Sequence, residues 1–207
     1  MSVKDITVII ATFKSSEKIK KCLNSISNEC KVFVIENSRD FELKKTLERE
    51  FQNVECIVTD NNLGYGKSNN LGLRKVTTKY ALILNPDTIL DPLALKNFLL
   101  AAKKISKFAI LGPNKEGIQN VKNYSEANYP IEVSHVKGFA MFLNLSEFKE
   151  VGFFDENFFM YFEEIDLCKR VNNFNKKIYS IPNVQIYHEG ASSTEKSIKK
   201  EIELSRN

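Results

Sequence analysis

Short apolar runs alternate with longer, helix-like stretches along the first half of the chain, and this alternation constrains the fold more than any other feature. The apolar runs are rich in Val and Ile and cover residues 6–13, 31–36, 54–59 and 80–84. The intervening stretches carry apolar side chains three or four residues apart and cover residues 15–27, 41–51 and 66–76. This pattern predicts an α/β fold, with buried strands joined by right-handed helical crossovers in a mostly parallel central sheet flanked by helices.

The chain has 207 residues, which is long enough for one α/β domain with a substantial core and short for two. A further helix is expected over residues 92–105, with Asp91 as its N-cap and Pro92 at its first position. Beyond residue 113 the strands become shorter and the loops more polar, and residues 114–128 look like a mobile excursion. We expect one domain with a nucleotide-binding half over residues 1–112, an acceptor-side half over 113–193 and a helical tail over 194–207.

Composition excludes several classes of protein. No segment approaches the roughly 20 apolar residues that cross a bilayer, and the first apolar run lacks the flanks of a signal peptide, so we expect a cytoplasmic protein. The four cysteines form no C-x-x-C pair and only two histidines are present. A zinc site is therefore disfavoured, and the cysteines are expected as reduced core thiols. The net charge of +4 suits an anionic substrate or a membrane surface but decides little.

Polar side chains stand where the predicted strands end, which is where open α/β sheets bind their ligands. Thr12 lies near the end of the first apolar run and Glu36 ends the second. After the fourth run, Asn85-Pro86-Asp87 places a carboxylate where it can hold Mg²⁺ or Mn²⁺ against a diphosphate, with the Asn85 amide oxygen or a water assisting. The alternative is that this tripeptide only forms a turn.

A segment with three glycines, residues 60–72, joins a predicted strand to a helix. Its backbone N–H groups could meet a phosphate at the helix N-terminus, which makes Asn62, Gly64 and Asn69 candidate donor-binding residues. The third glycine of a G-x-G-x-x-G fingerprint would fall on Asn69, so a dinucleotide oxidoreductase is disfavoured. No P-loop is present either. The alternative is that the glycines serve only turns and packing.

An aromatic stretch leads into a helix crowded with carboxylates over residues 152–170. Adjacent helical residues point about 100° apart, so Glu163 and Glu164 cannot both face one acceptor hydroxyl, and one of them should be the general base. Asp166 and Arg170 lie four residues apart and are expected to form an ordinary ion pair. Acids in a first helical turn also complement the helix dipole without any catalytic role.

His188 ends the last apolar run, over residues 186–188. A lone histidine is more often structural than a metal ligand. If it lies near Asp87, however, it completes a metal shell or contacts the pyrophosphate and shifts the preference toward Mn²⁺.

With these motifs assembled, the chain resembles glycosyltransferase family 2, and within it the bacterial rhamnosyltransferase-like branch. The matching segments occur in family order over nearly the whole chain, at residues 8–13, 34–38, 62–72, 84–87, 136–141, 153–164 and 188–190. The resemblance implies a GT-A fold in which Glu36 holds the nucleotide base with Thr12 nearby. It also implies that Asp87 is the metal carboxylate, that Gly138 and Tyr161 lie on the acceptor side, and that Glu164 is the base by position. Glu36 and Glu164 stand where the family more often has Asp.

The predicted function is a metal-dependent inverting glycosyltransferase of the hexosyltransferase class. It would use Mn²⁺ or Mg²⁺ and move a sugar, with rhamnose suggested by the branch, from a dTDP- or UDP-sugar to a glycan or lipid-linked acceptor in cell-surface polysaccharide synthesis. Relatives continue past residue 207, so we expect a shortened chain, and peripheral association with the inner face of the membrane stays open. The alternatives are a non-catalytic sugar-nucleotide-binding module and a nucleotidyltransferase.

Overall fold

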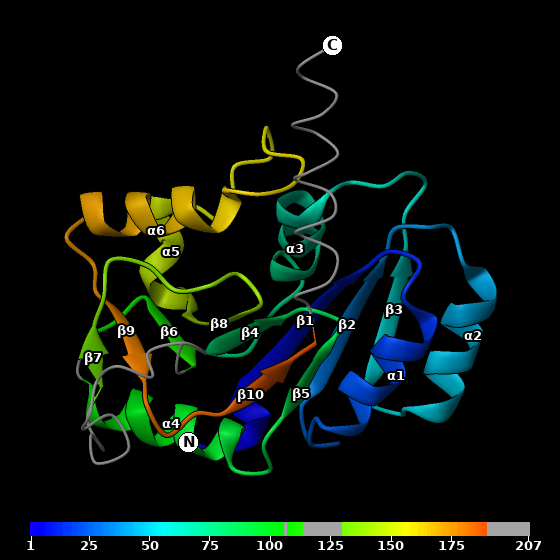
Figure 1. Cartoon of the computed structure of the whole chain (residues 1–207), viewed down its shortest axis with the longest axis horizontal. Coiled ribbons are helices and arrows are strands. Elements are labelled where there is room, and N and C mark those ends of the chain that lie inside the picture. Colours follow the sequence, from blue (N-terminus) through cyan, green and yellow to red (C-terminus); the bar gives the residue numbers. More distant parts are fainter. Residues whose placement is uncertain (106, 114–129, 190–207) are drawn as a thin grey trace.

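A single eight-stranded sheet runs through the molecule, with helices on both of its faces (Figure 1). The computed structural model describes residues 1–105, 107–113 and 130–189. The strand order is β3-β2-β1-β4-β8-β6-β9-β7, and a separate two-stranded ribbon pairs β10 with β5. The strands of the sheet are β1 Ile6–Thr12, β2 Lys31–Glu36, β3 Val54–Val58, β4 Tyr80–Leu84, β6 Ile110–Pro113, β7 Ile131–Glu132, β8 Ala140–Asn144 and β9 Ile178–Ile181. The ribbon consists of β5 Thr88–Leu90 and β10 Ile186–His188.

The first four strands are parallel to one another, as the alternation in the sequence predicts. Strand β8 then enters antiparallel between β4 and β6, which makes the sheet mixed beyond that point. The helices are α1 Ser16–Asn24, α2 Phe41–Glu50, α3 Tyr65–Leu73, α4 Ala94–Lys104, α5 Phe148–Val151 and α6 Glu163–Asn173, with short 3₁₀ turns at Val3–Asp5 and Leu145–Glu147. No helix within the described ranges is long and apolar enough to cross a membrane.

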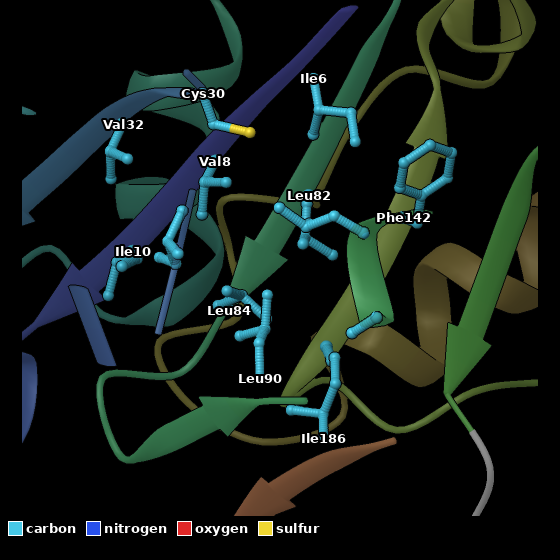
Figure 2. Close-up of a cluster of buried hydrophobic side chains, with 14 of the residues drawn as sticks. Ile6, Val8, Ile10, Cys30, Val32, Leu82, Leu84, Leu90, Phe142 and Ile186 are labelled. Atoms are coloured by element: carbon cyan, nitrogen blue, oxygen red, sulfur yellow. The ribbon is translucent and has the colours of Figure 1, made fainter. Parts of the chain in front are cut away.

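Two hydrophobic layers form on opposite faces of the sheet because successive strand residues point in opposite directions. In β4, Leu82 and Leu84 face the layer under α1, α2 and α4, while Ile83 faces the layer under α3, α5 and α6. Figure 2 shows Val8 and Ile10 of β1 beside Leu82 and Leu84, with Leu90 and Ile186 of the ribbon packed below them. The ribbon is therefore fixed to the core on the α1 side of the sheet.

Several element boundaries differ from the sequence-based prediction. The helix expected over 92–105 begins at Ala94, and Leu93 rather than Asp91 is its N-cap. Asp91 instead forms a turn before the helix, where its side chain accepts a hydrogen bond from the Leu93 N–H and its carbonyl accepts one from the Ala94 N–H, each at 2.9 Å. The four cysteines are free and buried, as predicted. The predicted excursion at 114–128 and the predicted tail helix at 194–207 lie outside the described residues.

Candidate active site

The turn after β4 lies at the carboxyl end of the parallel strands, next to the segment that leads into β8. The Asn85 N–H donates to the carbonyl of Phe139 at 2.9 Å, which continues the pairing of Leu84 with Ala140. The hydroxyl of Thr88 donates back to the Asn85 carbonyl at 2.8 Å and closes the turn. The Asn85 Oδ1 is buried and has no hydrogen-bond partner. The turn therefore presents an unused amide oxygen beside Asp87.

His188 reaches Asp87 because strands β5 and β10 pair antiparallel, with Thr88 opposite His188. The His188 Nε2 lies 3.2 Å from the Asp87 Oδ1 and 3.4 Å from the Asn85 Nδ2. The imidazole stacks on the ring of Phe139, with centroids 4.7 Å apart and planes 9° apart. Burial alone would raise the pKa of Asp87, but the hydrogen bond and charge of His188, together with Lys18, hold it below its usual value. The structure thus unites two side chains that the sequence separates by a hundred residues.

A lysine and a second carboxylate stand beside this pair, and the sequence analysis identified neither. The Lys18 Nζ of α1 lies 4.0 Å from the Asp87 Oδ2 and 3.8 Å from the Glu189 Oε2. The Glu189 N–H also donates to the Asp87 carbonyl at 3.0 Å. A shallow, open depression of the surface is lined by Lys18, Lys21, Asp87, Thr88, Ile89 and Glu189. The sequence offered one signal for Lys18. It lies in the first turn of a helix that follows a strand end, which is a common position for groups that bind anions.

These groups fit a hard divalent cation that shares its shell with phosphates. Asp87 offers a carboxylate, His188 an imidazole and Asn85 a buried amide oxygen without a partner. Among the described residues, no cluster of three or more His, Cys, Asp or Glu side chains could hold a metal alone. Mg²⁺ and its analogues are commonly held by one or two carboxylates plus substrate phosphates, so a sparse protein shell of this kind suits them.

Glu163 and Glu164 begin α6 and point into different surroundings. The side chain of Glu164 lies against Gly138, where a Cβ on that glycine would meet the Glu164 Cγ at 3.4 Å and its carboxyl carbon at 3.6 Å. Glu163 is 4% exposed and lies on the side of Gly66. Its Oε2 has no hydrogen-bond partner, and burial, with a smaller contribution from the charge of Glu164, raises the pKa of Glu163. The expected divergence of the two carboxylates is therefore present.

A short path of contacts joins Glu164 to Asp87. Glu164 contacts Gly138, and the next residue, Phe139, stacks on His188, which in turn contacts Asp87. The base candidate and the cation candidates therefore border the same segment, residues 138–139. Convergence of these groups on one bound substrate stays a prediction.

The N-terminus of α3 is occupied by protein rather than left open. Gly64 has φ +75°, and a Cβ there would lie 2.0 Å from the carbonyl oxygen of Phe159. That same carbonyl accepts a hydrogen bond from the Tyr65 N–H at 3.0 Å. Further along α3, the Asn70 side chain donates to the Phe154 carbonyl at 2.8 Å and accepts from the Phe154 N–H at 3.0 Å. The glycine segment therefore packs the loop before α6 onto α3, and phosphate binding by its N–H groups stays a prediction.

The remaining nucleotide-side candidates have specific local roles. Glu36 is fully buried, and its carboxylate accepts hydrogen bonds from the Ser38 N–H at 2.9 Å, the Ser38 hydroxyl and the Asp40 N–H at 2.7 Å. Both carboxylate oxygens of Glu36 therefore already bind the loop after β2. Contact between Glu36 and a nucleotide base stays a prediction. Asn62 Oδ1 accepts the Gly64 N–H at 3.0 Å.

Asn37 is a buried side chain that the sequence analysis missed. Its Oδ1 accepts from the Thr59 hydroxyl, the Leu63 N–H and the Ser68 hydroxyl, at 3.2, 3.3 and 3.0 Å. It thereby ties the loop after β2 to the start of α3. Its position next to Glu36 at a strand end was the available signal.

Unused hydrogen-bonding atoms coincide with the predicted site. In the described part of the chain, the buried side-chain oxygens without a partner belong to Thr12, Asn69, Asn85 and Glu163. All four residues were selected from the sequence as donor-binding or catalytic candidates. Buried polar groups are normally satisfied, so orphaned ones mark places where a ligand or water supplies the partner. Tyr161, the other acceptor-side candidate, has φ +70° and lies at the exposed end of the loop before α6.

Known proteins resemble this chain in sequence and in fold. It is 27% identical to the low-salt glycan biosynthesis hexosyltransferase Agl10 of Haloferax volcanii, with 89% of this chain and 67% of that protein covered. It is 22% identical to the N-acetylglucosaminyl-diphospho-decaprenol L-rhamnosyltransferase of Mycobacterium tuberculosis, with 90% and 76% covered. The mannosyltransferase PcManGT of Pyrobaculum calidifontis, solved with GDP-Man and Mn²⁺, matches with a TM-score of 0.70 at 14% identity, over 86% of this chain and 55% of that one.

The structural match confirms the predicted GT-A fold, an α/β fold with a mostly parallel sheet flanked by helices. The chain spans just over half of the length of the solved protein that it matches. Residues 7–168 match the family model described as Glycosyl transferase family 2. Since this match covers most of the sequence, the chain belongs to glycosyl transferase family 2.

Proposed function

We propose that the protein transfers a sugar, with inversion, from a nucleoside-diphosphate donor to a hydroxyl group of a glycan or lipid-linked acceptor. The observation that carries the proposal is the contact path from Glu164 through Gly138 and Phe139 to His188 and Asp87. This path supports the proposal because a carboxylate suited to proton removal and a group suited to diphosphate binding both border residues 138–139.

The proposed reaction is a direct displacement. The acceptor oxygen forms a bond to the anomeric carbon while the bond from that carbon to the diphosphate oxygen breaks, and Glu164 takes the acceptor proton. Asp87 and His188, with Asn85 beside them, would hold Mn²⁺ or Mg²⁺, which supplies charge stabilisation for the departing nucleoside diphosphate. Lys18 adds a further positive charge at the same place. No covalent intermediate on the protein is required.

The relatives suggest classes of donor and acceptor. One of them is a hexosyltransferase of glycan biosynthesis, and another is a rhamnosyltransferase that acts on a sugar linked to decaprenol diphosphate. We therefore propose a hexose or deoxyhexose donor, with dTDP-rhamnose as the first candidate and UDP-sugars next. For the acceptor we propose a sugar carried on a polyprenyl diphosphate in cell-surface polysaccharide synthesis.

Release of nucleoside diphosphate from a panel of dTDP-, UDP- and GDP-sugars, with and without Mn²⁺, tests the proposal. We expect slow donor hydrolysis that depends on the metal and is selective for one nucleotide. Asp87→Ala should abolish metal-dependent binding of the nucleoside diphosphate in calorimetry, while Glu189→Gln, which alters the neighbouring carboxylate, should retain it. An unchanged affinity in Asp87→Ala would remove Asp87 from the site.

The same assay separates the alternatives. A non-catalytic module would bind the sugar nucleotide but release no nucleoside diphosphate. A nucleotidyltransferase would instead form a sugar nucleotide and pyrophosphate from a nucleoside triphosphate and a sugar phosphate.

A further inference from the structure

Tyr65 lies where three segments meet: helix α3, the loop before α6 and the segment that leads into β8. It is the first residue of α3 and is partly buried against the hydrophobic layer under α3, α5 and α6. Its ring meets the ring of Phe154 edge to face, with centroids 5.8 Å apart and planes 78° apart. Its hydroxyl binds Gly138 and its backbone N–H binds Phe159. One residue of α3 therefore contacts both segments that border the candidate base.

The hydroxyl of Tyr65 holds the segment that joins the two parts of the candidate site. It donates a hydrogen bond to the carbonyl of Gly138. The carbonyl of the next residue, Phe139, accepts the Asn85 N–H at 2.9 Å. Two neighbouring carbonyls are thus bound by two different elements, α3 and the turn after β4. Because the peptide group between Gly138 and Phe139 is planar, the bond from Tyr65 also sets the direction in which the chain enters Phe139, whose ring stacks on His188.

The two glutamates at the start of α6 lie near the same tyrosine. Burial, followed by the charges of Glu163 and Glu164, raises the pKa of Tyr65. The hydroxyl therefore keeps its proton at neutral pH and serves as a donor. The Tyr65 N–H binds the Phe159 carbonyl at 3.0 Å and fixes the loop that leads into α6. Tyr65 thus holds the approach to α6 through its backbone and residues 138–139 through its side chain.

We propose that Tyr65 is a positioning residue that fixes the separation between Glu164 and the carboxylate of Asp87. That separation matters because the acceptor proton must be removed where the departing diphosphate is stabilised, and a shift of about 1 Å can cost about 10²-fold in rate. The proposal rests on the proposed function, since it takes Glu164 as the base. Tyr65 touches no reacting group in this scheme and acts through residues 138–139.

Tyr65→Phe tests the proposal because it removes the hydroxyl and keeps the ring that packs on Phe154. We expect kcat for Mn²⁺-dependent hydrolysis of dTDP-rhamnose, or of whichever sugar nucleotide is hydrolysed fastest, to fall roughly tenfold or more, because Glu164 is held less firmly. The dissociation constant of the matching nucleoside diphosphate in calorimetry should change less than about twofold, since Asn85 still holds the Phe139 carbonyl. A merely structural role would not confine the loss to kcat.

Two further variants serve as controls. Replacing Tyr65 by 4-aminophenylalanine puts an N–H donor in place of the hydroxyl and should restore kcat to within about threefold of the unmodified chain. Tyr80→Phe removes the hydroxyl of another buried tyrosine, which lies in the opposite hydrophobic layer with its hydroxyl 3.8 Å from the Met1 sulfur. It should leave kcat and the dissociation constant within about twofold. Melting temperatures establish that each variant is folded in the assay.

A double-mutant cycle tests whether Tyr65 acts through Glu164. In the Glu164→Gln background, Tyr65→Phe should lower kcat by less than about a further twofold, because the carboxylate whose position the hydroxyl sets is already lost. Losses that multiply would assign the hydroxyl to a different step and overturn the proposal.

Hydrogen exchange provides a second measurement that does not depend on activity. Tyr65→Phe should speed the exchange of backbone amides in residues 136–141 roughly fivefold, the factor that one hydrogen bond contributes, whereas Tyr80→Phe should leave it unchanged. Unchanged exchange in Tyr65→Phe, or unchanged kcat in the folded variant, overturns the proposal. If the unmodified chain hydrolyses no sugar nucleotide, the proposed function is contradicted, while exchange still decides whether Tyr65 holds this segment. The two failures are therefore distinguishable.

Discussion

Glu163 and Glu164 are neighbours in the sequence, but their surroundings give them different chemistry. Glu163 is buried, with one carboxylate oxygen unpaired and its pKa raised, so it resists carrying a charge. Glu164 is half-buried and lies against Gly138, whose lack of a side chain leaves room for the Glu164 carboxyl group. We therefore propose Glu164 rather than Glu163 as the group that meets the acceptor.

Glu164→Gln should lower kcat by roughly 10²–10⁴-fold, because a neutral amide cannot accept the proton. The affinity for nucleoside diphosphate in calorimetry should change little, since Glu164 does not contact Asp87 directly. Steady-state release of nucleoside diphosphate in the presence of acceptor measures the effect. Near-normal turnover in this variant would transfer the base role away from Glu164.

Glu163→Gln should raise the free energy of unfolding at neutral pH. The pKa of Glu163 is raised above its ordinary value of 4.5 in the folded state, so the charged form destabilises the fold at pH values above both pKa values. Below the ordinary value the carboxyl is protonated in folded and unfolded chains alike, and the advantage of the variant should disappear. Melting temperatures across that pH range measure the difference, and an advantage independent of pH would contradict this account.

At the scale of elements, α3 and the loop before α6 behave as one unit. Gly64 and Gly152 share nearly the same backbone conformation, with φ +75° and +72° and ψ −176° and 176°. A Cβ at Gly64 would collide with the Phe159 carbonyl, whereas a Cβ at Gly152 would meet nothing within 4 Å. Alanine substitutions at these two glycines therefore separate the energetic cost of backbone strain from the cost of a steric clash.

Gly152→Ala should lower the free energy of unfolding by about 1–3 kcal/mol through backbone strain alone. Gly64→Ala should lose roughly 1–3 kcal/mol more, because the loop must also move away from α3. Urea unfolding of both variants measures the difference. Equal losses would show that the close approach at Gly64 contributes nothing to stability.

The sequence allowed β1 to β4 and α1 to α4 to be predicted in order, because each of these elements carries its own local periodicity, but it did not reveal the short strand β5. It also allowed the meeting of Asp87 with His188 to be anticipated, since both end apolar runs. It could not reveal that Asn70 binds Phe154, which lies 84 residues away, or that Phe159 closes the N-terminus of α3. Such contacts depend on how the second half folds back over the first, and no local pattern encodes that geometry.

At the scale of the molecule, both hydrophobic layers share the same strands. Leu82 and Ile83 are adjacent, fully buried and on opposite faces of the central strand β4. A substitution that destabilises one hydrophobic layer should therefore also destabilise the sheet on which the other layer packs.

Leu82→Ala and Ile83→Ala should each lower the free energy of unfolding by about 2–5 kcal/mol. Both should shift the midpoint of one urea transition without changing its slope, since loss of either layer exposes the whole sheet. Far-ultraviolet circular dichroism measures the transition, with tyrosine fluorescence as a second probe. Separate transitions for the two variants would show that the layers unfold independently.

The attachment of the loop before α6 to α3 also matters for engineering acceptor choice. If residues 153–162 were replaced by the same loop of a relative, the residues at positions 154 and 159 would come from a loop that packs on a different α3 helix. Such chimeras should fold well only when residues 62–74 are exchanged together with the loop. The two segments are thus expected to be inherited as a pair.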